Sequence, residues 1–253
     1  MKRTIQLLLL SITSLIISNC DNKEEIVLDS PENQLPIQLK CGIDDYIKEE
    51  YDLDAHVLAV KLMNSEEVGA SDEILIPENY VDNVLRGLSS VYAFNSEKTD
   101  GFFNIMFIHT AEKEWYLKNA TVNLPANLAN EWKNNGETSN EELNAIISEY
   151  NLIATDSYSN DNNYIKITSD KYLNMKALCK KLTEIDVVNT AYTSSLWGDG
   201  NNIDISLSTN SLDIIFKTGS EDCPSGCLFS SYHKYNVMPT CEVQELESEI
   251  ILP

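Results

Sequence analysis

Basic residues are scarce in this sequence, which has 18 lysines and arginines against 40 aspartates and glutamates in 253 residues. The formal net charge of −22 repels nucleic acid and anionic headgroups, so we expect no nucleic-acid partner. The chain has only three histidines, and none lies in an HExxH or nucleophile-elbow pattern. After residue 19 there is no second apolar stretch long enough to span a bilayer. These absences exclude a nucleic-acid-binding or polytopic membrane protein, and we expect no cofactor and no metal ion.

The first nineteen residues have the layout of a secretory signal peptide. Lys2 and Arg3 supply positive charge, and residues 5–17 form an apolar run shorter than the roughly 20 residues of a membrane span. The tetrapeptide ISNC at residues 17–20 resembles the lipobox of bacterial lipoproteins. This resemblance implies that Cys20 carries palmitate-like acyl chains and that the chain is cut just before it. Two or three acyl chains anchor a protein stably in a membrane.

The residues behind Cys20 bear on the final address. Lys23, Glu24 and Glu25 resemble the export signal of Bacteroidota surface lipoproteins, which implies an outer-membrane protein facing the cell exterior. The low-glycine composition, rich in Asn and Ile, also favours such a source. Two alternatives stay open: by the enterobacterial rule Asp21 retains the protein at the inner membrane, or the charges are only a solvated tether.

The mature chain divides into a tether and three folded segments. Removal of residues 1–19 takes away two basic residues and no acidic one, which lowers the net charge from −22 to −24. Residues 20–40 are expected to form a flexible acidic tether that spans roughly 25 Å. We then expect a helical portion with one strand over residues 41–118, a compact α+β segment over 119–195, and a β extension over 196–253.

The segment from residue 41 to residue 118 is expected to hold two helices and a strand. Residues 44–64 and 76–92 both carry apolar side chains at spacings of three and four, which is typical of amphipathic helices. Pro77 suits the first turn of the second helix. The apolar run FFNIMFIHT at residues 102–110 predicts a strand. The expected core positions of the two helices are Ile47, Tyr51, Ala55, Leu58, Leu62, Val81, Val84, Leu85, Leu88 and Val91.

Residues 119–195 are expected to form a ferredoxin-like split βαβ sandwich, because their elements follow the order βαββαβ. Two helices are predicted, one capped by Ser139 or Asn140 and one capped by Asn174. The segment resembles the propeptide-like inhibitor domains of subtilisin-type proteases, which implies protease inhibition as an alternative function. The predicted strands cover residues 121–124, 151–158, 163–169 and 187–193.

Five cysteines follow Cys20. Disulfides are the rule in exported proteins, but an odd number leaves at least one cysteine over. Cys179 lies in an apolar helical stretch, and we expect it to be a buried free thiol. We expect at least one disulfide among the other four, with the pairing open, and we disfavour a zinc site because thiolate zinc sites prefer two-residue Cys spacing. The disulfide candidates are Cys41, Cys223, Cys227 and Cys241.

The motif DCPSGC at residues 222–227, followed by an aromatic-rich strand, resembles a Gly-Asp-Cys-Pro-x-Gly-Cys motif near the C-terminus of uncharacterised secreted proteins. The segment WGDGNNI at residues 197–203 fits the pattern of those proteins as well. The resemblance covers most of the mature chain and implies no particular activity.

Two further patterns point to chemistry. Asp199, Asn201 and Asp204 suggest a calcium loop, but Ile203 occupies a ligand position of that motif, so a turn before a strand is favoured. Ser230 or Ser231 near His233 would allow a hydrolytic Ser–His pair, whereas His56 and His109 lie on other elements. We favour a non-enzymatic module that binds an extracellular protein or glycan, with an inhibitor-like module or a secreted hydrolase as alternatives.

Overall fold

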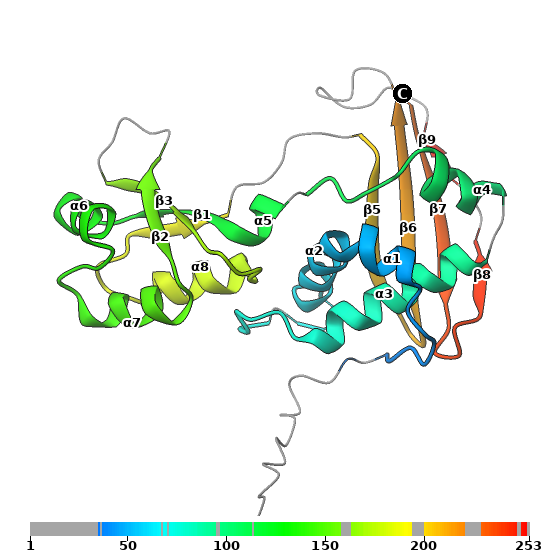
Figure 1. Ribbon diagram of the computed structural model, residues 1–253, viewed down its shortest axis with the longest axis horizontal. Helices are drawn as coiled ribbons and strands as arrows, with labels where there is room; N and C mark the ends of the chain where they lie inside the picture. The colour runs from blue at the N-terminus through cyan, green and yellow to red at the C-terminus, as the bar shows by residue number, and fades with distance from the viewer. Residues whose placement is uncertain are drawn as a thin grey trace, which may run out of the picture. The chain divides into compact units, whose positions relative to one another are not determined.

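The computed structural model describes residues 35, 37–66, 68–69, 71–94, 97–112, 114–157, 163–193, 200–220, 229–246 and 249–251. They form an α+β protein with helices near the N-terminus and two antiparallel sheets (Figure 1). The expectations on the signal peptide, the lipidated Cys20, the Lys23–Glu25 signal, Cys223 and Cys227 lie outside the described residues. Among the helices that are described, none has the length and apolar character needed to cross a membrane.

The predicted helix over residues 44–64 is in fact two helices. Asp44 caps the first by accepting hydrogen bonds from the backbone N–H groups of Tyr46 and Ile47. Tyr51 separates the two, with φ −113° and ψ 15°. The five expected core positions of this segment are all buried, and so are the five of the next helix. The helices of this part are α1 (Asp45–Glu50), α2 (Asp52–Met63), α3 (Glu78–Ala93), α4 (Glu97–Asp100) and α5 (Glu114–Lys118).

The predicted strand over residues 102–110 was wrong. The chain instead forms a π-helix, η2 (Gly101–Ile105), and then continues without regular structure. Phe102 and Phe103 are both buried in one core, whereas a strand would direct adjacent side chains to opposite faces. The backbone N–H of Ile108 donates to the carbonyl of Phe102 and closes the turn. A helical turn thus buries two neighbouring rings that no strand could bury together.

The first sheet has the strand order β2-β3-β1-β4, and every neighbouring pair is antiparallel. The predicted caps are confirmed, because Asn140 accepts from the N–H of Leu143 and Asn174 accepts from that of Ala177. One helix, α6, was not predicted. The elements are β1 (Asn119–Asn123), α6 (Ala126–Asn135), α7 (Glu141–Glu149), β2 (Ile153–Asp156), β3 (Tyr164–Thr168), α8 (Met175–Thr183) and β4 (Thr190–Tyr192).

The second sheet has the order β5-β6-β7-β8, and β9 pairs with β7 beside β8. Helices α1–α3 cover one of its faces (Figure 1), and the two parts share one core. At Gly87 an added Cβ would lie 2.9 Å from Leu212, so glycine permits a close helix–sheet contact. The second sheet, which was predicted as a β extension, therefore shares one hydrophobic core with the N-terminal helices. Its strands are β5 (Asn202–Ser208), β6 (Ser211–Ser220), β7 (Phe229–Val237), β8 (Val243–Glu245) and β9 (Glu249–Ile251).

Candidate functional site

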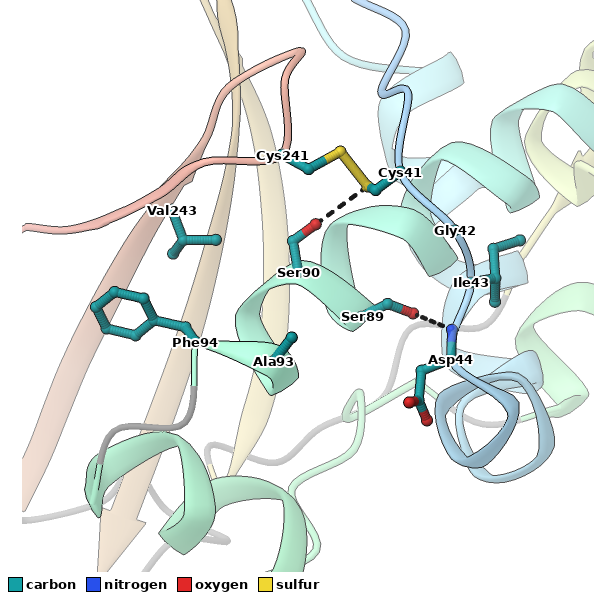
Figure 2. A pocket seen from close by; sticks show the side chains of 10 residues that line it. All are labelled: Cys41, Gly42, Ile43, Asp44, Ser89, Ser90, Ala93, Phe94, Cys241 and Val243. Atoms are coloured by element: carbon teal, nitrogen blue, oxygen red, sulfur yellow. Dashed lines mark hydrogen bonds between the residues drawn. A yellow bond between two sulfur atoms is a disulfide. The ribbon is translucent and has the colours of Figure 1, made fainter.

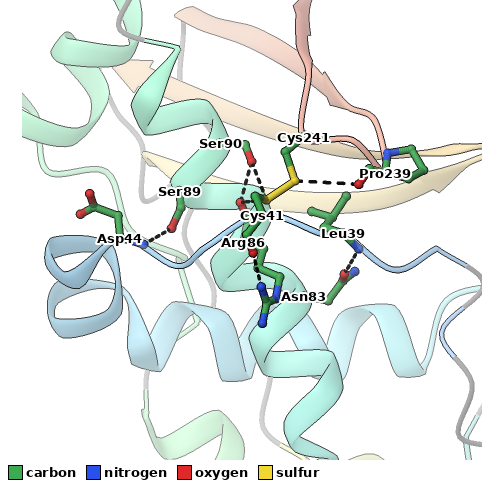
Figure 3. Close-up of a disulfide and its surroundings, with 9 residues drawn as sticks. All are labelled: Leu39, Cys41, Asp44, Asn83, Arg86, Ser89, Ser90, Pro239 and Cys241. Carbon is green, nitrogen blue, oxygen red and sulfur yellow. Dashed lines mark hydrogen bonds between the residues drawn. A yellow bond between two sulfur atoms is a disulfide. The ribbon is translucent and has the colours of Figure 1, made fainter.

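A disulfide joins Cys41 to Cys241 across a sequence separation of 200 residues (Figure 3). The disulfide expected from the sequence is thus present, and its pairing is defined. Next to it, the backbone N–H of Lys40 donates to the carbonyl of Pro239. Cys241 has φ 68°, in the left-handed region that few residues other than glycine adopt. The bond fixes the first folded residues to the turn between β7 and β8.

A row of polar side chains on α3 holds the segment before α1. Asn83 accepts a hydrogen bond from the N–H of Leu39 at 2.8 Å (Figure 3). It also donates to the carbonyl of Ile37 at 3.2 Å. Further along α3, Arg86 donates to the carbonyl of Cys41, and Ser89 accepts from the N–H of Asp44. The apolar positions of this helix were identified from the sequence, but the role of its polar ones was not. Its polar row, at spacings of three, was the signal that an extended segment lies against it.

A pocket of about 440 Å³ opens beside the disulfide (Figure 2). It lies between the N-terminal segment, the end of α3 and the strand that follows Cys241. None of the described residues that line it is a histidine or a free cysteine, and Phe94 is the largest apolar side chain among them. The lining residues are Cys41, Gly42, Ile43, Asp44, Ser89, Ser90, Ala93, Phe94, Cys241 and Val243.

The polar groups of this pocket are already used within the protein. Ser89 Oγ receives the N–H of Asp44, and the carboxylate of Asp44 caps α1. Ser90 Oγ donates to the carbonyl of Arg86 at 2.8 Å. Recognition of a polar ligand needs a few free, converging polar groups, and these three groups hold the chain instead. The pocket suits an apolar group, and its lining offers no acid–base pair for catalysis.

A second candidate is the pair formed by Asp54 and His109. The two side chains lie 2.7 Å apart, from Asp54 Oδ2 to His109 Nδ1. Asp54 Oδ1 accepts hydrogen bonds from both the N–H and the hydroxyl of Thr110, so this buried carboxylate is well satisfied. The ring of Tyr51 stacks on that of His109 at 4.7 Å. A carboxylate that orients an imidazole is an arrangement that general-base catalysis uses. Here the carboxylate also attaches the segment after η2 to α2.

The third candidate is the Ser–His pair anticipated from the sequence. Ser231 Oγ lies 3.3 Å from His233 Nε2, because residues two apart on β7 face the same side of the sheet. Ser231 Oγ is also 2.6 Å from Thr218 Oγ1 on the neighbouring strand. Burial, and then the charge of Lys98, lower the pKa of His233, whereas Glu245 acts in the opposite direction. The structure therefore brings these two residues together, and Ser230 is not part of the pair.

The remaining expected residues do not converge. His56 lies on α2 with its Nδ1 2.8 Å from the carbonyl of Asp52, and its ring contacts Tyr172. Of the suggested calcium loop, Asp199 lies outside the described residues. Asn201 accepts from the N–H of Gly219, and Asp204 pairs with Lys61 at 3.5 Å. In the part of the chain that is described, no three His, Cys, Asp or Glu side chains are placed to hold a metal ion.

Cys179 is a buried free thiol, as expected. Burial in the core of the first sheet raises its pKa to about 12. A thiol reacts as its thiolate, so this side chain is inert at neutral pH.

Comparisons with protein-family models, with curated proteins and with solved structures found no match to this chain.

Proposed function

We propose that this protein is an exported lipoprotein whose folded part is a non-enzymatic binding module. In this proposal the acylated Cys20 anchors it in the outer membrane, and the fold faces the cell exterior. The observation that carries the proposal is the disulfide between Cys41 and Cys241. Structural disulfides persist in oxidising compartments and are rare in the cytosol, so this bond supports export.

The arrangement of the first folded residues also suits a tethered protein. Chain ends usually fray unless something ties them down. Here Asn83, Arg86 and Ser89 bind the backbone of residues 37–44, and the disulfide fixes the same stretch to the C-terminal sheet. A tether that leads from Cys20 would therefore join the folded part at a segment that hydrogen bonds and a disulfide hold in place.

We also propose a ferredoxin-like arrangement for the part that contains the first sheet. The strand order β2-β3-β1-β4 supports it, and so do the antiparallel pairs and the helices between β1 and β2 and between β3 and β4. A fold of this kind serves many functions, so it does not by itself favour protease inhibition.

A hydrolase is the second candidate, and the contact between Ser231 and His233 favours it. A catalytic serine of this kind reacts covalently with a fluorophosphonate probe through its activated hydroxyl. Labelling of the wild-type chain that Ser231→Ala abolishes and Ser230→Ala preserves would support the hydrolase. We expect no labelling, because the serine also bonds to Thr218 in the middle of a sheet.

Fractionation of cells tests the anchor. Cys20→Ala should move the protein from the membrane fraction to the soluble fraction and abolish incorporation of labelled palmitate. Cys179→Ala is the matched control, because it removes a buried cysteine and leaves the lipobox intact. Retention of the Cys20→Ala variant in membranes would refute the lipoprotein proposal.

Surface exposure has its own test. Replacement of Lys23, Glu24 and Glu25 by alanine should leave the protein acylated but protected from protease added to whole cells. If the variant is cleaved as readily as the wild type, these residues are only part of the tether.

A further inference from the structure

Three consecutive apolar side chains are exposed directly after the π-helix. Ile105 is 70% exposed, Met106 42% and Phe107 56%. Most other large apolar side chains of the described chain are buried, and the remaining exposed ones do not form such a run. We call residues 105–107 the apolar tip. Contiguous exposed apolar surface of this kind marks interaction sites in soluble proteins.

Buried residues lie on both sides of the apolar tip. Phe102, Phe103 and Ile108, which flank it in the sequence, are buried in the core shared by the N-terminal helices and the second sheet. The hydroxyl of Tyr46 on α1 donates to the carbonyl of Phe103 at 3.1 Å. The N–H of Met106 donates to the carbonyl of Gly101. The backbone that carries the exposed side chains is thus held in place before any partner arrives, which favours binding.

The backbone at the apolar tip adopts conformations that are rarely used without a reason. Phe107 has φ 48°, and a bulky residue in the left-handed region is uncommon. The π-helix before it is also rare and often occurs at functional sites. Both features direct Ile105, Met106 and Phe107 to the surface, although the apolar composition of residues 102–110 is typical of a buried strand.

The charge around the apolar tip is acidic. Helix α4 directly precedes η2 and α1 contacts it through Tyr46, and the exposed acids of these two helices outnumber their two lysines. Tyr92 of α3 also contacts η2, through the ring of Phe103. One of these lysines, Lys98, is paired with Glu245 at 2.6 Å. The whole chain carries −22, which opposes both self-association and binding to anionic lipid. The exposed acids are Asp45, Glu49, Glu50, Glu97 and Asp100.

We infer that the apolar tip is the contact through which the protein binds a partner protein that presents an apolar surface rimmed by lysine and arginine. The apolar side chains enter the apolar surface, and the acids of α1 and α4 face the basic rim. This inference rests on the proposed binding role but not on the lipid anchor.

The test uses the full chain with Cys20→Ala, so that no lipid contributes to binding. The probe is a fluorescent amphipathic peptide of leucine and lysine, and its affinity is measured by anisotropy. The double variant Ile105→Asn/Phe107→Asn should bind the peptide about tenfold more weakly, because truncated central anchors cost that much or more. Asparagine tolerates the left-handed backbone at residue 107. Ile105→Asn alone should show part of the loss and guards against misfolding of the double variant.

Ile153→Asn is the matched control, because Ile153 is an isoleucine of β2 with 61% exposure. It should bind like the parent chain. Equal binding by the double variant and the parent, or no binding by the parent, would overturn the inference. So would tip-dependent binding to vesicles of phosphatidylethanolamine and phosphatidylglycerol, or tip-dependent dimers in sedimentation. Failure here leaves the anchor untouched, since the chain lacks the acylated cysteine.

Discussion

Cys41 is disulfide-bonded to Cys241, with their Cα atoms 5.8 Å apart, although 200 residues separate them in the chain. This bond and the side chain of Asn83 attach the same extended segment to the second sheet and to α3, respectively. The N-terminal and C-terminal parts of the fold are thereby closed into one covalent loop.

Loss of the disulfide should lower stability strongly. The variant Cys41→Ala/Cys241→Ala should lose roughly 2–5 kcal/mol of unfolding free energy, because a bridge over a long loop restricts the unfolded chain. Urea unfolding of the oxidised proteins measures this difference. A reductant should destabilise the wild type more than the variant, which lacks this bridge. Equal transition midpoints for variant and wild type would show that the bridge contributes little.

Asn83→Ala should destabilise the fold by about 1–3 kcal/mol, because it leaves the buried N–H of Leu39 and the carbonyl of Ile37 without their partner. Asp82→Ala is the control on the same helix, since Asp82 makes only a partly exposed pair with Arg86 at 3.8 Å. Its effect should stay within about 0.5 kcal/mol. A similar loss for both variants would mean that the segment is not held by Asn83.

His233 should make stability depend on pH. Its pKa in the folded protein lies below the ordinary value of 6.5, because burial and Lys98 disfavour the charged ring. The unfolded chain therefore binds the proton more readily, and stability falls as the pH drops from about 6.5 through the lowered pKa. His233→Gln should flatten this part of a stability–pH curve. An unchanged slope in His233→Gln would contradict this account.

The sequence predicts most of the helices and strands, because apolar periodicity and caps are local signals. Asn174 shows this: it was expected as a cap and its side chain does accept the N–H of Ala177. The strand β9 and the short helices α4 and α5 were missed. The helix α6 was missed too, although its buried Leu128, Ala129 and Trp132 share one face and Gly136 ends it. The run at 102–110 was misjudged because an apolar composition does not reveal whether adjacent rings face one side or two.

Contacts between distant segments were harder to predict. Asp54 of α2 is buried and bonded to His109 and Thr110, which lie some fifty-five positions later in the chain. The order of segments suggested an appended β extension, but Leu212 and Phe216 of that sheet pack against α3 and η2. Local sequence patterns do not show which distant segments pack together. The close contact between Gly87 and Leu212 is one such long-range pairing.

The intact mass of the protein extracted from membranes without reductant tests the central proposal most directly. The proposal predicts a chain that begins at Cys20, carries two or three acyl groups and has the mass deficit of at least one disulfide. Peptide mapping after alkylation should then find Cys179 modified only in denaturant, because its thiol is buried. The account would be contradicted by a mass that corresponds to a chain without acyl groups that starts at Met1 or at any residue other than Cys20.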